Sequence, residues 1–322
     1  MKPYIRKPQL VATIGGTITD KAIVGIAIVD GYLYVVRSEC RDVEVYQIQL
    51  PDRPLIGVLR ISGIRMVFNM ASSARKRCLY LADFAESVGN VRSVSLSKNV
   101  DELFSRPSET ISADEKEVHV KILEATVFAA DVGRPLGISV SSIDDRVLVV
   151  CENPNRVRIY SPYKTLLSII SLSETELEAP RQAIQFSPGR LALIHGFLGR
   201  WNRLCLIDTS GNVLGTYGTT SGSAPTQIHW PAALIVDGRG RMLIGDRENN
   251  RVHLVGRDFK LVRHLLTGSD GIVRPRRLAF HPADGTLYVG QVSPEVKVFR
   301  VAHPMPPEAE LGPVPPPGDA EG

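Results

Sequence analysis

The stretch WPAALIVDGRGRMLIGDRENNRVHL, residues 230–254, contains three short apolar segments separated by polar turns. Residues 234–236, 242–245 and 252–254 each have the apolar, β-branched character of a strand. The Asp237-Gly238 pair between the first two suits a tight turn that needs positive φ angles. The stretch therefore predicts strand, turn, strand, turn, strand.

Five other parts of the chain repeat this pattern with variation in sequence. Three copies follow Pro135, Pro180 and Pro275, and two N-terminal copies lack the proline. The third strands are marked by Val43, Val91, Val157, Leu204, Val252 and Val296. Neighbouring markers lie 44 to 48 residues apart, except for the 66 residues between the second and the third. This period is close to the length of one four-stranded propeller blade.

Six copies predict an all-β chain that forms a six-bladed β-propeller over residues 1–302. The last copy stops after its third strand, but an unassigned strand at residues 8–15 precedes the first copy. We expect this N-terminal strand to complete the last blade, because that pairing removes two exposed sheet edges. The insertion at 97–117, rich in Ser, Asp, Glu and Lys, is predicted to be a loop. The proline- and acid-rich segment 303–322 is predicted to be a disordered tail.

Composition narrows the class of protein. The chain has 43% hydrophobic residues, enough for a packed core, and a mild formal net charge of +4. Its longest apolar run, residues 23–29, is too short to cross a membrane, so no membrane partner is expected. The four cysteines are widely spaced, as expected for buried free thiols in a reducing compartment, and we predict the cytoplasm. They are Cys40, Cys78, Cys151 and Cys205.

Several motifs resemble one family of propellers. The segment DRENNRV at 246–252, with Trp230-Pro231 before it and DGRG at 237–240 between, looks like an NHL repeat. The segments 68–83 and 134–140 add to this resemblance. The chain as a whole resembles the six-bladed NHL domain of tripartite-motif proteins, most closely the divergent invertebrate versions.

The resemblance implies a module that binds RNA or protein and is often attached to a ubiquitin-ligase domain. The chain contains no cysteine and histidine zinc module, so ligase activity is not expected from these residues.

One face of such a propeller consists of the loops that enter each first strand and those that join the second and third strands. Arginine is abundant in these loops, and an occasional aromatic residue accompanies it, which is the chemistry that single-stranded nucleic acid uses. The candidate partner-binding residues are Arg134, Arg181, Arg200, Trp201, Arg247, Arg274, Arg276 and Arg277. For Arg274, Arg276 and Arg277, contact with phosphate and simple solvation remain alternatives. Trp230 is predicted to pack between blades.

Other polar residues in these loops recur because of the repeat. We predict a structural role for Asp246, Asn250, Arg251 and Arg156, with the guanidinium groups pairing with the aspartate at the end of the second strand.

The rival class is a metal-dependent lactonase or lyase, in which carboxylates and histidines converge on the central channel. The predicted channel residues are Gly25, Arg65, Gly137, Ala183, Ala233 and Arg277, and a shift of one residue would add Gln182. This set contains no metal ligand, so neither a metal nor another cofactor is expected. Its two arginines, Arg65 and Arg277, suggest anion binding as a weaker idea.

We therefore expect a non-catalytic scaffold that binds a protein partner, as in the substrate-recognition part of a ubiquitin-ligase system. Binding of single-stranded RNA is the second hypothesis and a metal-dependent hydrolase the third. No catalytic residue and no small-molecule substrate are predicted.

Overall fold

The computed structural model describes residues 4–15, 20–85, 88–96, 99–113, 116–197, 201–237 and 239–302. In these residues nearly all regular structure is β-strand, with one short α-helix and one turn of 3-10 helix, η1 (Gly268–Asp270). The all-β prediction is therefore confirmed. The predicted tail at 303–322 lies outside the described residues.

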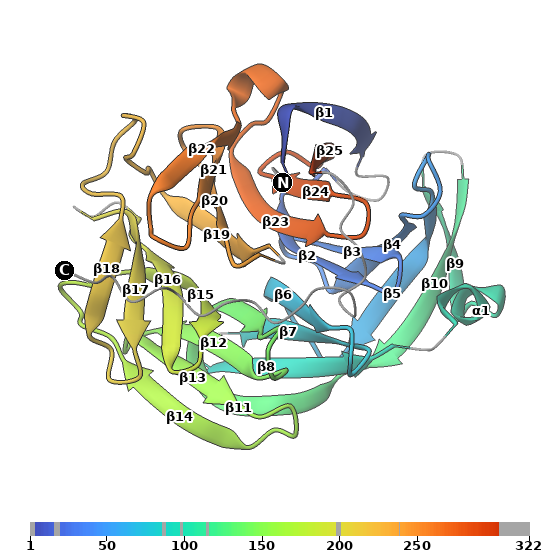
Figure 1. Ribbon diagram of the computed structural model, residues 1–322. Helices are drawn as coiled ribbons and strands as arrows, with labels where there is room; N and C mark the ends of the chain where they lie inside the picture. The colour runs from blue at the N-terminus through green and yellow to red at the C-terminus, as the bar shows by residue number, and fades with distance from the viewer. Residues whose placement is uncertain are drawn as a thin grey trace.

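The strands form five hydrogen-bonded sheets arranged about the centre of the molecule (Figure 1). The first contains, in spatial order, β2 (Ile23–Val29), β3 (Tyr32–Arg37), β4 (Asp42–Gln47), β5 (Leu55–Ser62), β10 (Lys116–Glu124) and β9 (Glu109–Ala113). The second contains β14 (Leu166–Ser171), β13 (Arg156–Tyr160), β12 (Val147–Glu152), β11 (Thr126–Val140), β8 (Val88–Ser95), β7 (Cys78–Ala85) and β6 (Val67–Ser73). The third contains β15 (Pro180–Ser187), β16 (Arg190–His195), β17 (Arg203–Asp208) and β18 (Val213–Tyr217). The fourth contains β19 (Pro231–Val236), β20 (Met242–Asp246), β21 (Arg251–Val255) and β22 (Leu261–Leu266), and the fifth contains β23 (Pro275–His281), β24 (Thr286–Gln291), β25 (Val296–Ala302) and β1 (Tyr4–Ile14).

The long strand β11 belongs to two units of the repeat. Its first part, from Thr126 to Gly133, pairs with β8, and its second part, from Arg134 to Val140, pairs with β12. The seven-stranded sheet therefore consists of two four-stranded units that share one strand. Each unit begins with a first strand near the centre of the molecule, and these are β2, β6, the second part of β11, β15, β19 and β23 (Figure 1).

The two ends of the strand order meet in one sheet. Strand β1 pairs antiparallel with β25, from Tyr4 opposite Ala302 to Ile14 opposite Val296. The Tyr4 hydroxyl also donates a hydrogen bond to Asp237, 3.1 Å away in the neighbouring unit. The predicted N-terminal strand therefore exists and is the fourth strand of the last sheet.

The insertion is not the loop that its composition predicts. It contains helix α1 (Val100–Ser105), strand β9 and the start of β10. Strand β10 adds to β5 in parallel, and Val118 and Val120 are buried against Val58. On the helix, Val100 and Phe104 are buried at a four-residue spacing, and they join the core of the first sheet. This apolar burial explains why α1 and β10 form although the sequence of the insertion is polar.

Side-chain hydrogen bonds join all six first strands near the centre. The first strands contact one another in cyclic order, and each junction is crossed by a side chain that bonds to the backbone of the next strand. The six bonds are Ser72 to Ile28, Asn69 to Leu136, Ser139 to Ala183, Leu234 to Gln182, Arg277 to Ala232 and Arg277 to Val24. These bonds hold the first strands in a fixed arrangement around the centre.

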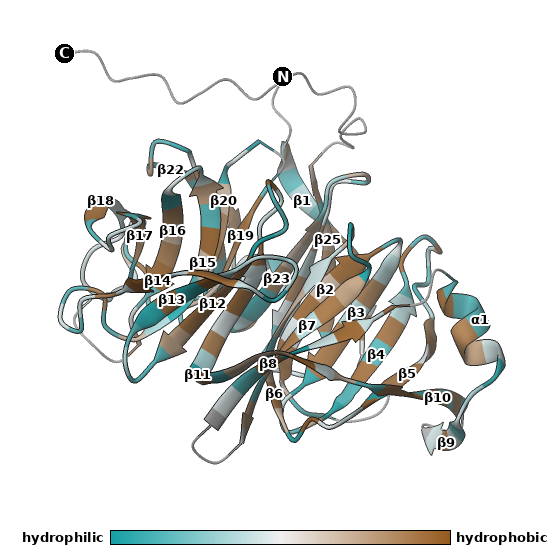
Figure 2. Cartoon of the chain, turned by 90° about the horizontal axis from the view of Figure 1, so that it is seen from below, coloured by the Kyte–Doolittle hydropathy of each residue, from teal (hydrophilic) through white to brown (hydrophobic). Residues whose placement is uncertain are grey.

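The core lies between the sheets, which pack face to face. Strand β20 is buried along its whole length, and hydrophobic residues, brown in Figure 2, recur along the strands of all the sheets. Burial on both faces is expected where each sheet packs between two neighbours. Cys78, Cys151 and Cys205 lie in this core as free thiols, and Cys40 is half-buried.

Candidate functional site

All six first strands carry a β-bulge at the same place, where the pairing with the second strand shifts by one residue. A bulge bends its strand and re-aims the side chain of the extra residue. The six extra residues are Val24, Phe68, Leu136, Arg181, Ala232 and Arg276.

Five of these bulge residues surround a cavity of about 290 Å³. The cavity is lined by Phe68, Arg134, Leu136, Arg181, Trp230, Ala232, Arg247, Arg276 and Arg277. We call it the arginine recess, since five of its nine lining residues are arginines and none is acidic. Arg134 is exposed, whereas Arg181, Arg247, Arg276 and Arg277 are half-buried.

Aromatic rings hold two of these arginines in place. The Arg181 guanidinium lies 4.9 Å from the centre of the Phe197 ring, and that of Arg247 lies 3.7 Å from the centre of Trp230. The two rings meet edge to face at 4.0 Å. The order Arg181, Phe197, Trp230, Arg247 therefore alternates cations and aromatic rings, and each contact stabilises its neighbour.

Trp230 enters the recess through an unusual backbone conformation. Its φ angle is +63°, in the left-handed region that bulky residues rarely adopt. The Asn202 side chain accepts a hydrogen bond from the Trp230 backbone N–H at 2.9 Å and holds this conformation. The strained turn directs the indole ring into the recess.

Arg277 forms the floor of the recess. Its Nε donates to Val24 O at 2.6 Å, and its two terminal nitrogens donate to Phe68 O and Ala232 O, each at 3.0 Å. A fourth bond, at 2.8 Å, reaches Arg276 O. One guanidinium thus connects strands β2, β6 and β19 to β23. Its acceptors are neutral carbonyl groups, so its positive charge is not neutralised by them.

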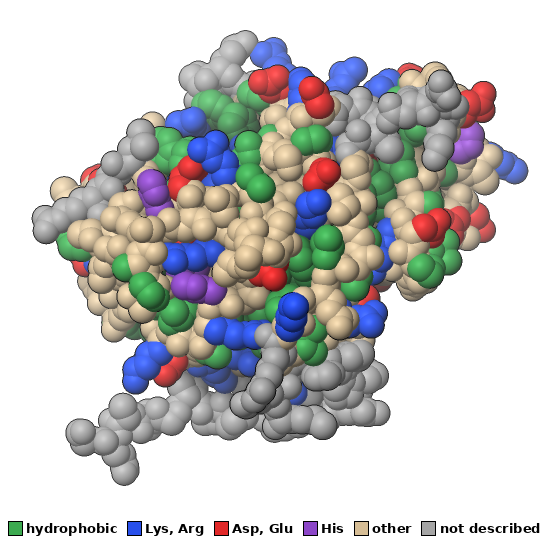
Figure 3. All heavy atoms as spheres, turned by 90° about the horizontal axis from the view of Figure 1, so that it is seen from above, with side chains coloured by type: hydrophobic (Ala, Val, Ile, Leu, Met, Phe, Trp, Pro, Cys, Tyr) green, Lys and Arg blue, Asp and Glu red, His purple; other side chains and the backbone are tan. Residues whose placement is uncertain are grey.

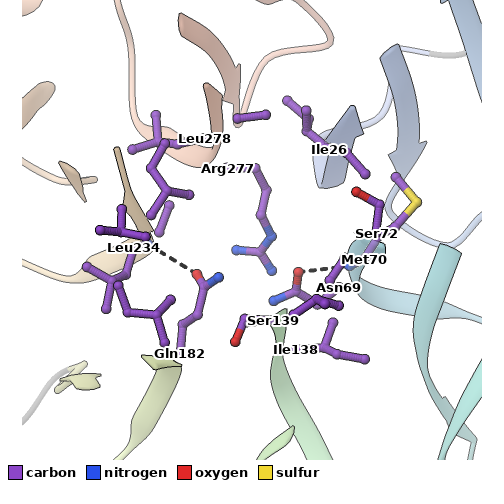
Figure 4. A pocket seen from close by; sticks show the side chains of 18 of the residues that line it. Ile26, Asn69, Met70, Ser72, Ile138, Ser139, Gln182, Leu234, Arg277 and Leu278 are labelled. Carbon is purple, nitrogen blue, oxygen red and sulfur yellow. Dashed lines mark hydrogen bonds between the residues drawn. The ribbon is translucent and has the colours of Figure 1, made fainter. Parts of the chain in front are cut away.

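A second cavity, also of about 290 Å³, lies on the other side of Arg277 (Figure 4). Asn69, Ser139 and Gln182 line it, and all three are engaged in the bonds between first strands. Its lining residues include no histidine, cysteine or carboxylate. Arg277 is the only charged residue in its lining, and the others are apolar or neutral and polar, in contrast to the arginine recess.

The recess holds more positive charge than its surroundings balance. Arg134 pairs with Glu152 at 2.9 Å, and Arg247 lies 3.5 Å from Glu248. Among the described residues, no carboxylate forms an ion pair with Arg181, Arg276 or Arg277. The Nε atoms of Arg181 and Arg247 are buried without a hydrogen-bond partner among these residues.

The pKa values of the arginines show the cost of this arrangement. Burial lowers the pKa of Arg181, Arg247 and Arg276, and the charges of Arg247 and Arg181 lower that of Arg276 further. Burial, then the charges of Arg276 and Arg181, lower the pKa of Arg277 to about 9. Its four carbonyl contacts act in the opposite direction, and a guanidinium stays charged in proteins. The recess therefore contains like charges that repel one another.

The structure brings together five of the predicted face residues and places two others, Arg274 and Trp201, outside the recess lining. Arg274 is exposed and pairs with Glu248 at 2.8 Å, outside the recess lining. Trp201 forms an isolated bridge with Thr220 and lies under the Arg203 guanidinium, 4.6 Å from its ring centre. Arg200 lies outside the described residues.

Two predicted channel residues are wrong, and the bulge explains one of them. The residues that follow the bulge at equivalent positions are Gly25, Asn69, Gly137, Gln182, Ala233 and Arg277. Gln182 therefore replaces Ala183, because the bulge shifts the register by one. Asn69 replaces Arg65, which is exposed and precedes β6, where its backbone N–H donates to Asp83.

The remaining repeat positions have structural surroundings. Arg251 Nε donates to Asp246 at 2.7 Å, which is the pairing that the repeat predicts. Asn250 has a positive φ of +51° and accepts a bond from the Arg274 backbone N–H. Arg156 lies opposite Cys151, not a carboxylate, so its expected aspartate partner is missing from that strand pair.

Sequence reasoning missed the contribution of Trp230, Phe68 and Leu136 to the recess. Trp230 does pack against Phe197, as an interior residue would, but it also lines the cavity. Its position before Pro231, at the entry to a first strand, was the sequence feature that could have placed it in the recess. Phe68 and Leu136 carry no sequence signal, since only the bulge directs them to the recess.

No three His, Cys, Asp or Glu side chains within the described ranges are grouped as a metal site would require. The helices found in those ranges also lack the length and apolar character of a membrane-spanning helix.

Two of the solved structures with similar folds come from Bacteroides species. A protein of unknown function from Bacteroides thetaiotaomicron matches with a TM-score of 0.62 at 11% identity, covering 93% of this chain and 73% of the other. A second protein of unknown function, from Bacteroides caccae, matches with a TM-score of 0.54 at 14% identity, covering 80% and 81%. At these identities the likeness shows the fold alone. No family model and no curated protein matches this chain.

Proposed function

We propose that the chain is a six-bladed β-propeller of the NHL type and that it acts as a non-catalytic binding module. Three observations support this architecture: six four-stranded units, first strands that contact one another in cyclic order, and an N-terminal strand in the last sheet. The DRENNRV segment at 246–252 supports the NHL assignment.

The arginine recess carries the functional part of the proposal. Five guanidinium groups and Trp230 converge on one cavity whose lining contains no carboxylate. Such a cavity attracts a negatively charged group and disfavours a positively charged one. We propose that it anchors an acidic segment of a protein partner, and that in a ubiquitin-ligase assembly this contact would select the substrate.

Binding of single-stranded RNA is the second candidate, because arginines beside aromatic rings suit phosphates and bases. However, Arg247 covers the Trp230 ring at 3.7 Å, and Arg181 lies over the Phe197 ring. These ring faces are therefore already occupied. The side of the molecule shown in Figure 3 also carries interspersed basic and acidic side chains, so that side lacks the continuous basic stripe that an RNA backbone favours. We therefore place a protein partner first.

A binding experiment with labelled ligands separates the two candidates. Fluorescence anisotropy would measure binding of a degenerate Asp- and Glu-rich peptide pool and of a random single-stranded RNA pool, at two salt concentrations. We expect peptide binding that the double variant Arg181→Gln/Arg276→Gln loses and that the control Arg274→Gln retains. Salt-dependent RNA binding with a log–log slope of about one per contacting arginine would instead favour RNA. Absence of binding to either pool would contradict the proposal.

A further inference from the structure

The arginine recess has a charge and shape that distinguish between kinds of anion. Carboxylates and phosphate groups are the common anions of protein segments, and they differ in both properties. An ionised carboxylate carries one charge and two oxygens in one plane, whereas a phosphomonoester carries nearly two charges and three terminal oxygens.

The charge balance of the recess matches a dianion. Glu152 and Glu248 neutralise much of the charge of Arg134 and Arg247 at the rim. Arg181, Arg276 and Arg277 have no ion pair with a described carboxylate. Burial lowers the pKa of all three, and the charges of neighbouring arginines lower it further, although Glu152 opposes the shift at Arg181. A ligand with two negative charges relieves more of this repulsion than a ligand with one.

The available donors also approach from several directions. Arg181 comes from β15, Arg276 from β23, and Arg247 from the segment between β20 and β21. Arg277 already donates four of its five N–H groups to carbonyls, so it supplies charge to the floor. Donors placed on different sides of a cavity suit the diverging oxygens of a tetrahedral group better than a planar carboxylate.

The donors are held ready before any ligand arrives. The Phe197 and Trp230 rings fix the guanidinium groups of Arg181 and Arg247. Donors that are fixed in place before binding reduce the ordering that binding would otherwise require.

We infer that the arginine recess binds a phosphomonoester dianion on a protein segment, that is, a phosphorylated serine or threonine side chain. This inference rests on the proposed function and specifies its ligand. A side chain that projects from an extended segment can carry the phosphate past exposed Arg134 to the half-buried arginines. The internal phosphates of RNA are monoanionic diesters and lack the second charge.

The first test uses two small probes of the same shape. Isothermal titration calorimetry would compare methyl phosphate, mostly a dianion at pH 7.5, with methyl sulfate, a monoanion. We expect methyl phosphate to bind about tenfold more tightly or better, and Arg276→Gln to weaken its binding by about tenfold or more, while Arg274→Gln leaves it unchanged. Equal affinities for the two probes, or no binding of methyl phosphate, would overturn the inference.

The second test identifies the source of the phosphate and separates this inference from the proposed function. Degenerate peptide pools with a central phosphoserine, glutamate or serine would be compared with a 5′-phosphorylated RNA pool. We expect preference for the phosphoserine pool. Equal binding of the glutamate pool would overturn the phosphate inference but leave the acidic-segment proposal intact. Preference for the RNA would overturn both.

Discussion

Arg277 should be a main determinant of the stability of this fold, because its side chain connects four first strands. The Arg277→Met substitution keeps a long side chain but removes the bonds to Val24, Phe68 and Ala232, at 2.6, 3.0 and 3.0 Å. Each of these bonds crosses from β23 to a different strand. The carbonyl oxygens would lose a charged hydrogen-bond donor, and only water in the cavity could donate to them instead.

The expected loss follows from these three bonds. At about 1 to 1.5 kcal/mol each, they contribute about 4 kcal/mol. The value for each bond is set at or just below the lower end of the range for charged donors, because Arg277 is only half-buried. Relief of the repulsion with Arg276 and Arg181 returns about 1 kcal/mol. The free energy of unfolding should therefore fall by about 3 kcal/mol. For a chain of this length, that lowers Tm by about 4 °C.

The assay is thermal and urea unfolding followed by far-UV circular dichroism. Arg276→Met is the matched control, since it is the same substitution one residue earlier. The Arg276 side chain forms no hydrogen bond with a described residue and is repelled by its neighbours. Its removal should leave Tm unchanged or raise it. An Arg277→Met variant as stable as the wild type would refute the reasoning.

Three further predictions concern other parts of the molecule. Deletion of residues 1–15 removes the fourth strand of the last sheet and should lower the free energy of unfolding by about 4 kcal/mol or more, measured by urea denaturation; an unchanged midpoint would contradict the pairing. Burial, then the charge of Arg203, lowers the pKa of His195 to about 4. The unfolded chain therefore binds the extra proton first, so stability falls as pH drops from 6.5 to 4, by about 3 kcal/mol from this group. His195→Gln should flatten that part of the stability curve, whereas exposed His119→Gln should not; equal curves for both would contradict the assignment. A Cβ at Gly57 would overlap the Phe104 ring, so Gly57→Val should destabilise by about 2 kcal/mol and Phe104→Ala in the same chain should recover part of it; additive losses in the urea midpoints would count against this contact.

The repeat made most of the fold predictable. The period of the third-strand markers and the unassigned strand at 8–15 were sufficient to predict the strands and the pairing of β1 with β25. The insertion was not predictable by composition, because its order depends on a few apolar residues, such as Val100 and Phe104, that bury against a distant strand. Parallel pairing of β10 with β5 leaves no local signal.

The residues of the site could be predicted from the sequence, but the arrangement of their side chains around a cavity could not. Arg134, Arg181, Arg247, Arg276 and Arg277 could be selected because the repeat places their loops on one face. The bulge has no sequence signal, so the predicted strand register was wrong by one residue at Ala183. Without that register, the role of Arg277 as a bridge between strands could not be separated from solvation or phosphate contact.

Trp230 can report directly on whether a partner's acidic group binds in the arginine recess. The chain has two tryptophans, so a Trp201→Phe variant leaves Trp230 as the sole tryptophan, whose emission can be excited selectively over that of tyrosine. Titration of this variant with the Asp- and Glu-rich peptide pool should give a saturable change in Trp230 emission, because Arg247 lies 3.7 Å from its ring. Adding Arg181→Gln and Arg276→Gln should abolish the change. Peptide binding that leaves the emission of Trp230 unaltered would place the ligand elsewhere and contradict the account.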